Sequence, residues 1–310
     1  MHRVVDGAGP EAGARLPGVL CAIAAVLLFS GFTLVSRLGL TTTALTLPDI
    51  ALLRFTVAGL LLLPLLWRFR TSGLRLHQAA LLAFTGGLGF ALFAYLGFRL
   101  APASHGGVLV HGTIPLFTFL LLRAATGQRV ERGRRVGLAL ILAGVVAIGW
   151  DSFAGAAPRQ YVGDAALLLA SLCWASYGLL AQRYAIAPLR AAAIVAPGSL
   201  ACFLPLYVLL PGTRMTEAAL PDIVFQALFQ GMLVGVVALL VYTRAVATLG
   251  AQTTALFTAA VPCLTTLGAL ALLQEVPSPL AWTGVATATA GMAIALSAGR
   301  MTVRQPGPRA

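Results

Sequence analysis

Lysine is absent from this 310-residue chain, and cysteine is scarce. All 21 basic residues are arginine. A phosphate-binding P-loop and a Schiff-base site both require lysine, which excludes ATP hydrolysis through the usual nucleotide loop. The cysteines have no metal-ligand spacing and lie in apolar segments, so we interpret them as packing residues and expect no metal and no cofactor. They are Cys21, Cys173, Cys202 and Cys263.

Charge is also scarce. Charged residues make up 10% of the chain, hydrophobic residues 59%, and the mean hydropathy is +0.92. A soluble globule needs roughly a quarter of its residues charged, so this composition predicts a protein surrounded by lipid. The net charge of +12 does not indicate a nucleic-acid partner, because the arginines fall between apolar runs and not on one solvated face.

Ten apolar runs are long enough to cross a bilayer, which takes about 20 helical residues. The first run is too long for a secretory signal, and we expect it to remain as a helix. The predicted spans are 16–36, 48–67, 78–98, 103–122, 133–150, 163–181, 191–210, 223–243, 251–273 and 280–298.

The distribution of arginine predicts the orientation, because short arginine-rich loops stay in the cytoplasm. Sixteen arginines lie on the side of the two chain ends. The other side carries four, namely Arg37, Arg99, Arg159 and Arg214. We therefore expect a multi-pass protein of the cytoplasmic membrane, with cytoplasmic tails at residues 1–15 and 299–310.

The two halves of the chain repeat each other. Earlier segments align with small shifts, which place Phe29 and Phe32 on Trp174 and Tyr177. Five spans per half force the second half to enter the membrane inverted, as in many secondary transporters. We predict an all-α membrane fold of two inverted five-helix repeats, residues 16–153 and 154–298, around a central cavity. A shift of 147 positions carries the later matches, which are Tyr95 on Tyr242, Pro115 on Pro262, Gln128 on Glu275, Gly137 on Gly284 and Gly144 on Gly291.

Several short motifs show a family resemblance. They are Phe29-Ser-Gly-Phe32 followed by Arg37, Leu53-Arg54-Phe55, Pro115 thirteen residues before Gln128, Trp174-Ala-Ser-Tyr177, and Pro262 thirteen residues before Glu275. With these motifs the chain resembles the EamA family of the drug/metabolite transporter superfamily, from about residue 16 to residue 298. The resemblance implies ten helices, cytoplasmic termini and a central cavity that opens alternately to each side. Family members move amino acids, other metabolites or drugs, so the fold does not determine the substrate.

Arg54 is an ionisable residue inside a predicted span, which makes it a candidate functional residue. One interpretation is an anion clamp facing the cavity. The other, which we favour here, is a structural arginine paired with Asp49 or with helix-end carbonyls. No acidic residue occurs in the middle of a span, which leaves His105 and His111 as the groups there that titrate near neutrality.

Polar and aromatic residues at helical spacing are candidates for the cavity wall. Ser30 and Thr33 share one helix face, as do Trp174 and Tyr177, whose alternative role is packing between helices. We add Tyr95 to the predicted wall.

His105 and Gln252 are related by the 147-residue shift. We predict that they form a polar pair facing the cavity, joined by His111, because lipid cannot satisfy their hydrogen bonds. The alternative is a hydrogen bond that only fastens two helices together.

The leading functional hypothesis is a secondary transporter with a small-molecule substrate, exporting an amino acid or a related metabolite by alternating access. Two alternatives stay open. One is an intramembrane enzyme that uses His105 and His111, although their spacing does not give a shared helix face. The other is a membrane scaffold or sensor without transport.

Overall fold

The computed structural model describes residues 12–69, 73–127, 131–154, 158–209 and 212–298, and this part of the chain is helical with short connections. The helices follow one another as α1(Ala12–Thr42), α2(Leu47–Phe69), α3(Leu76–Ala83), η1(Phe84–Leu88), α4(Gly89–Leu100), α5(Ala103–Gly106), η2(Gly107–Gly112), α6(Ile114–Thr126), α7(Arg132–Ala154), α8(Pro158–Arg183), α9(Pro188–Leu209), α10(Leu220–Gln226), η3(Ala227–Val237), α11(Ala238–Leu249), α12(Ala251–Thr258), α13(Val261–Gly268), η4(Ala269–Leu273) and α14(Pro279–Ser297). The elements marked η are π-helical.

These helices join into ten segments long and apolar enough to cross a membrane, and all ten predicted spans are confirmed. The clearest difference lies in the first span, which continues to Thr42 and not to residue 36. In its last turns threonine hydroxyls donate to the carbonyl oxygens four residues earlier, as Thr41 does to Arg37 and Thr42 to Leu38, which satisfies these hydroxyls within the helix. The extension carries Arg37 to the end of the bundle.

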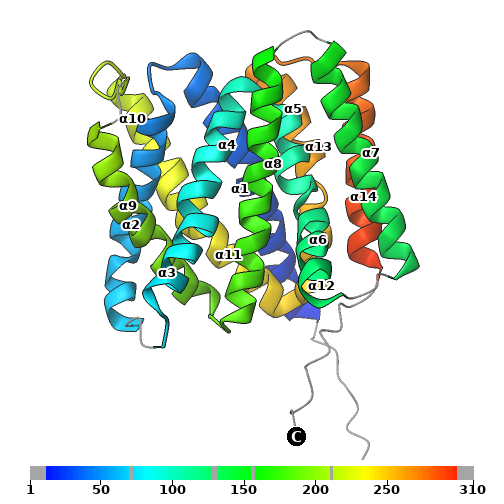
Figure 1. Cartoon of the computed structure of the whole chain (residues 1–310), viewed down its shortest axis with the longest axis horizontal. Coiled ribbons are helices and arrows are strands. Elements are labelled where there is room, and N and C mark those ends of the chain that lie inside the picture. Colours follow the sequence, from blue (N-terminus) through cyan, green and yellow to red (C-terminus); the bar gives the residue numbers. More distant parts are fainter. Residues whose placement is uncertain (1–11, 70–72, 128–130, 155–157, 210–211, 299–310) are drawn as a thin grey trace, which may run out of the picture.

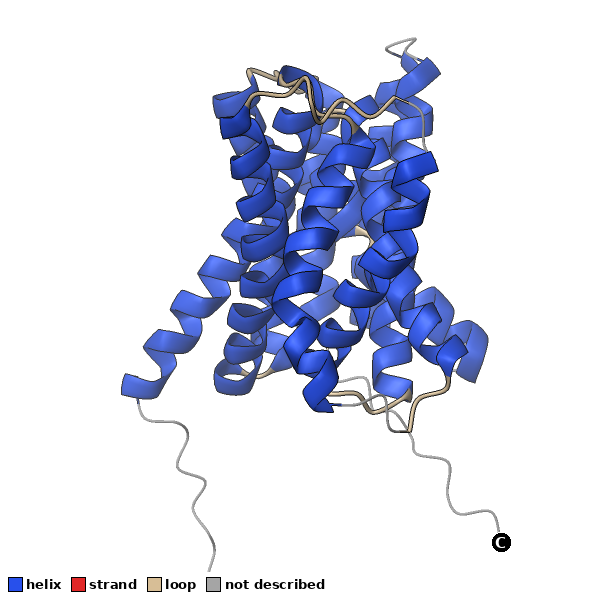
Figure 2. Cartoon of the chain, turned by 90° about the vertical axis from the view of Figure 1, so that its left-hand side faces the viewer, coloured by secondary structure: helices blue, strands red, loops and turns tan. Residues whose placement is uncertain are grey.

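The bundle has two unlike ends. An even number of crossings brings the start of α1 and the end of α14 to the same end, which we call the termini end (Figure 1). The opposite or far end carries the α1–α2 connection and the starts of α5, α8 and α14. Figure 2 shows the helices lying close together at the far end and spreading apart at the termini end.

The fourth and ninth spans are interrupted at matching positions. A turn at Thr113 separates η2 from α6, and a turn at Ala259 and Ala260 separates α12 from α13. Each break lies two or three residues before a proline, Pro115 or Pro262, which has no N–H for the helix ladder and clashes with the carbonyl four residues earlier. Broken helices within a membrane occur where the backbone is buried in protein or lines a cavity.

The paired helices α7 and α14 touch backbone to backbone through the glycines matched by the repeat. A Cβ added to Gly137 would lie 2.6 Å from the Gly291 oxygen, and one added to Gly144 would lie 2.7 Å from the Gly284 oxygen. A two-fold axis between the helices explains why each glycine faces the symmetry mate of the other. Such close approach between membrane helices requires small residues.

We predict that Gly144→Ala lowers the melting temperature of the purified protein by roughly 5 °C, because the added methyl group meets backbone atoms that cannot move aside. Gly149→Ala on the same helix is the matched control, since nothing lies within 4 Å of the added carbon. Equal melting temperatures for the two variants in detergent would show that the α7–α14 contact is looser than described.

Candidate functional site

A cavity of about 930 Å³ lies between the helices of the two halves. Its wall reaches the termini end at Arg134, Gln182 and Leu296. The far-end residues described below do not belong to the wall. The cavity therefore opens toward the termini end and is closed at the far end.

Arg54 of α2 lines this cavity and is only 9% exposed. Its guanidinium lies over the Phe32 ring, with Cζ 5.1 Å from the ring centroid, and beside the Tyr95 side chain. Its Nη1 has no hydrogen-bond partner, and no carboxylate pairs with it, within the described residues. A nearly buried cation with free hydrogen-bonding capacity faces the cavity.

Arg54 does not pair with Asp49, which was one of the two structural partners expected for it. Asp49 is already satisfied by the backbone N–H and the hydroxyl of Thr46, by the Tyr207 hydroxyl and by the Arg214 backbone N–H. These donors come from the residue that precedes α2 and from the second half of the chain. They satisfy the Asp49 carboxylate without Arg54.

An aromatic wall runs away from Arg54 along one side of the cavity. Phe32 stacks on Phe90 at 5.7 Å between ring centroids, Phe90 contacts Trp174 at 4.8 Å, and Trp174 contacts Tyr177 at 5.3 Å. All four rings line the cavity. Trp174 and Tyr177 thus lie on this wall, and α4 supplies a further ring, Phe90, that the sequence analysis did not single out.

His111 and Gln252 also lie on the wall. The His111 ring stacks on Phe29 at 5.9 Å, and its Nδ1 has no hydrogen-bond partner within the described part. Gln252, at the start of α12, is exposed at the termini end and donates to the carbonyl oxygens of Leu296 and Ser297 at 3.3 and 3.2 Å. His111 thus lies deeper in the cavity and Gln252 at its mouth.

Three of the predicted wall residues are not on the wall. Phe29 and Phe32 face the cavity, so Ser30 and Thr33, each one residue further along, lie about 100° round the helix. Both are buried, and Thr33 meets Gly106 of the fourth span. Tyr95 is fully buried behind Phe32, where its hydroxyl lies 3.3 Å from Gln230 Oε1.

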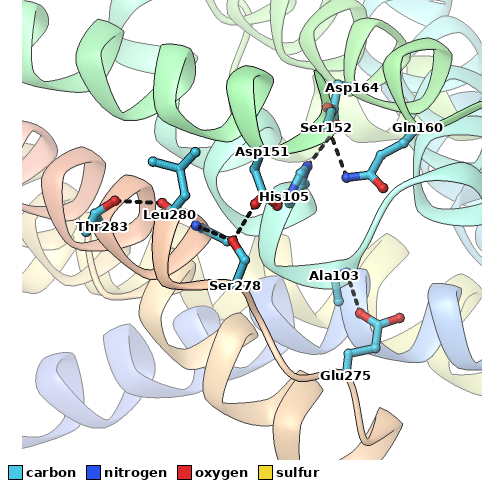
Figure 3. Close-up of polar contacts among 11 residues, drawn as sticks. Ala103, His105, Asp151, Ser152, Gln160, Asp164, Glu275, Ser278, Leu280 and Thr283 are labelled. Carbon is cyan, nitrogen blue, oxygen red and sulfur yellow. Dashed lines mark hydrogen bonds and ion pairs between the residues drawn. The ribbon is translucent and has the colours of Figure 1, made fainter. Parts of the chain in front are cut away.

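His105 does not line the cavity, in contrast to the prediction that His105 and Gln252 face it as a pair. Because the repeat is inverted, the two matched residues lie at opposite ends of the bundle, and His105 is enclosed at the far end between Asp151 and Asp164 (Figure 3). His111 is separated from it in the cavity. The two histidines are not brought together, so they do not form the two-histidine site that the enzyme alternative assumed. Within the described residues, no group of three or more His, Cys, Asp or Glu side chains is placed to hold a metal ion.

An ion pair between the two halves closes the far end. Arg37 of α1 donates to Glu275, which follows η4, and also to the backbone oxygen of Phe98 at 2.7 Å. The second Glu275 oxygen accepts from the backbone N–H of Ala103 at 2.8 Å (Figure 3). Glu275 therefore stabilises the start of a first-half helix from the second half, and we call this arrangement the latch.

The sequence analysis missed two buried amides in the eighth span. Gln226 donates to the Val35 carbonyl at 2.9 Å, and Gln230 donates to the Ser36 hydroxyl at 3.0 Å. They lie four residues apart on one helix face within an apolar stretch, which was the available signal. Their role is to fasten this span to α1 behind Tyr95.

A family model supports the same interpretation over most of the chain. The model of the EamA-like transporter family matches residues 16–150 and again residues 161–297. The chain belongs to the EamA-like transporter family. It is a multi-pass membrane transporter, and its two matched segments are the two inverted repeats of the fold.

Solved structures show the same fold. Sixteen chains match this transporter, and one of them, titled "Crystal structure of protein", is 21% identical with a TM-score of 0.59. The alignment covers 91% of this transporter and 97% of that chain. No curated protein matches.

We predict that Arg37→Gln and Glu275→Gln each lower the melting temperature, while the double variant is at least as stable as either single variant. Removing one partner leaves the other charge half-buried and unpaired, and removing both relieves it. The control is Glu217→Gln, whose pairing with Arg214 joins side chains that are 63% and 61% exposed and should contribute little. Additive losses in the double variant would contradict the latch.

Proposed function

We propose that this transporter exports a small metabolite that carries a carboxylate, an amino acid or a close relative, across the cytoplasmic membrane by alternating access. The observation that carries the proposal is Arg54 in the cavity wall, whose Nη1 has no hydrogen-bond partner and which pairs with no carboxylate among the described residues. Burying a cation without a counter-ion costs several kcal/mol, roughly, unless another group compensates it. A planar guanidinium matches a carboxylate with two parallel hydrogen bonds, so a substrate carboxylate would supply that compensation.

The charge of the cavity favours the same class of substrate. The charged residues on the wall are Arg54 and Arg134, and no aspartate or glutamate belongs to the part of the wall that the structure describes. The field in the cavity is therefore positive, which attracts an anionic group and repels a substrate with only positive charge.

The aromatic wall supports a substrate with an apolar part next to its carboxylate. Ring faces bury apolar groups, and their negative faces also attract an ammonium group. The cavity volume of about 930 Å³ is in the usual range for small-molecule sites and is large enough for an amino acid with bound water.

The arginine bias supports cytoplasmic placement of the termini end, so the cavity described here would be loaded from the cytoplasm. Opening at the far end requires separation of the latch, which joins the two halves there. In such folds the two inverted repeats rock around a fixed central site, which opens the site to one side of the membrane and then to the other.

The function is tested by the efflux of radiolabelled amino acids from proteoliposomes. We predict that Arg54→Gln weakens the apparent affinity for a transported amino acid by roughly ten- to a hundredfold, because a charge-assisted hydrogen bond contributes about 1.5–3 kcal/mol. Arg54→Lys should lie between, since it keeps the charge and loses the planar fork. Arg123→Gln, exposed at the termini end, is the control and should transport normally.

The outcomes separate the parts of the proposal. If no amino acid or related carboxylate moves through the wild-type protein, the substrate class is wrong. If Arg54→Gln transports with unchanged affinity, the protein is a transporter whose substrate does not bind at Arg54.

The orientation is tested by labelling introduced cysteines in intact cells with a membrane-impermeant maleimide. Thr42→Cys at the far end should react from outside, and Glu131→Cys at the termini end should react only after the cells are opened. Both positions are exposed, so the difference reports sidedness. Labelling of Glu131→Cys from outside would invert the orientation and the proposed direction of loading.

A further inference from the structure

Three titratable groups from different helices meet at the far end, away from the cavity. His105 lies in the first turn of the fourth span and is 0% exposed. Its Nδ1 lies 2.9 Å from Asp164 Oδ1 of α8, and its Nε2 lies 3.4 Å from Asp151 Oδ2 of α7. Figure 3 shows the imidazole between the two carboxylates, so both ring nitrogens face an oxygen that only accepts hydrogen bonds when ionised. We call these three residues the far-end triad.

The carboxylate oxygens that do not face the ring already accept hydrogen bonds from serine hydroxyls. The Ser152 hydroxyl donates to Asp164 Oδ2 and accepts from Gln160 Nε2 at 3.0 Å. The Ser278 hydroxyl donates to Asp151 Oδ1 and accepts from the Ala281 backbone N–H at 3.0 Å. Each hydroxyl hydrogen is used once, so neither serine has another hydrogen to place between a carboxylate and the ring.

A neutral histidine supplies one hydrogen fewer than the two contacts of the ring require. A neutral imidazole has one N–H, which serves one carboxylate, and its other nitrogen has a lone pair that would point at the second carboxylate oxygen. Both contacts are favourable only if a second hydrogen lies on the ring or on one aspartate. With that hydrogen the three residues carry a net charge of −1, and without it a net charge of −2.

The charged groups on the surrounding helices do not replace this proton. His105 is flanked by the rest of the fourth span and by α1, α4, α7, α8, α13 and α14. Glu275, one turn away at Ala103, is paired with Arg37 of α1. The helices α13 and α14 contain no acidic or basic residue. The remaining arginines of the fourth span and of α7, namely Arg123, Arg132, Arg134 and Arg135, lie at the termini end. The other ionisable residues of the flanking segments are not hydrogen-bonded to the triad within the described residues, and they are Cys21, Tyr95, Arg99, His111, Arg159, Tyr161, Cys173, Tyr177, Arg183 and Cys263.

The triad also joins the two halves. His105 and Asp151 belong to the first five spans, whereas Asp164 and the serine partner Ser278 belong to the last five. Separation of the halves at the far end would break these contacts and expose the triad to water from that side. None of the three residues lines the cavity, so the proton enters and leaves from the far side.

We propose that the far-end triad is a proton-binding site that holds the far end shut when protonated, so that the far-side pH controls how often the transporter opens there. Because the proton returns to the side from which it came, the site sets the conformational equilibrium and does not drive transport by proton flux. At low pH on the far side the transporter keeps its cavity open toward the termini end. At high pH on the far side it opens more often at the far end. This inference goes beyond the proposed substrate class and does not depend on it.

The test measures far-end opening without any substrate. Ala101→Cys, fully buried against α8 at the far end, reports opening through its reaction with a maleimide in a background without the native cysteines. The labelling rate of Ala101→Cys is divided by the labelling rate of the exposed Thr42→Cys, which removes the intrinsic pH dependence of thiol chemistry. We expect this ratio to rise with pH, by at most about tenfold per pH unit, because one proton is linked to opening.

Asp164→Asn and Asp151→Asn are the decisive variants. An asparagine in either place donates its own N–H to the ring, so no extra proton is needed and the labelling ratio should become independent of pH. His77→Gln, an exposed histidine at the termini end, is the matched control and should keep the wild-type profile. A flat wild-type ratio, or an unchanged pH profile in both aspartate variants, would overturn the proposal.

A second measurement needs no introduced cysteine. In protein labelled with ¹⁵N-histidine, with the His105 signals assigned by their loss in His105→Gln, both ring nitrogens should share a hydrogen with a neighbour at about pH 6. A ring nitrogen that carries no hydrogen and accepts none would overturn the proposal directly.

Discussion

The bilayer offers no hydrogen bonds, and the rest of this structure depends on that constraint. Each polar group placed in the membrane must find its partner inside the protein. Threonine hydroxyls bond back to their own helices, and Gln226 and Gln230 bond to α1. Against this background an unpaired group is informative. Arg54 departs from the rule with the costliest kind of side chain, and it does so in the cavity wall.

The two halves share their architecture but not their charges. The helix breaks near Pro115 and Pro262 and the glycine contacts between α7 and α14 follow the two-fold axis closely. The ends of the bundle do not. The repeat places Gln182 opposite Arg37 in the alignment and Gln252 opposite His105, so residues that form ion pairs at the far end have neutral counterparts at the termini end. Neutral amides hold an interface less tightly than charge-assisted bonds, which agrees with a cavity open at the termini end.

The spans and the repeat could be predicted from the sequence because lipid imposes long apolar runs and duplication leaves a fixed spacing. The candidate site was harder to predict from the sequence. Arg54 was expected to pair with Asp49 or with helix-end carbonyls, yet Asp49 finds donors in Tyr207 and Arg214, far away in sequence. The His105 environment depends on residues from three other spans. The repeat correctly related it to Gln252, but inversion sends related positions to opposite ends, so a shared cavity did not follow.

Substrate recognition in the proposed function depends on an anionic group meeting Arg54, and this can be measured with a matched pair of ligands on the unmodified protein. The affinity of the purified transporter for an amino acid that it transports should be compared with that for the corresponding α-carboxamide, which keeps the shape and removes the negative charge. The account predicts that the carboxamide binds at least about tenfold more weakly, the loss expected for one charge-assisted contact. Equal affinities for the two ligands would contradict it.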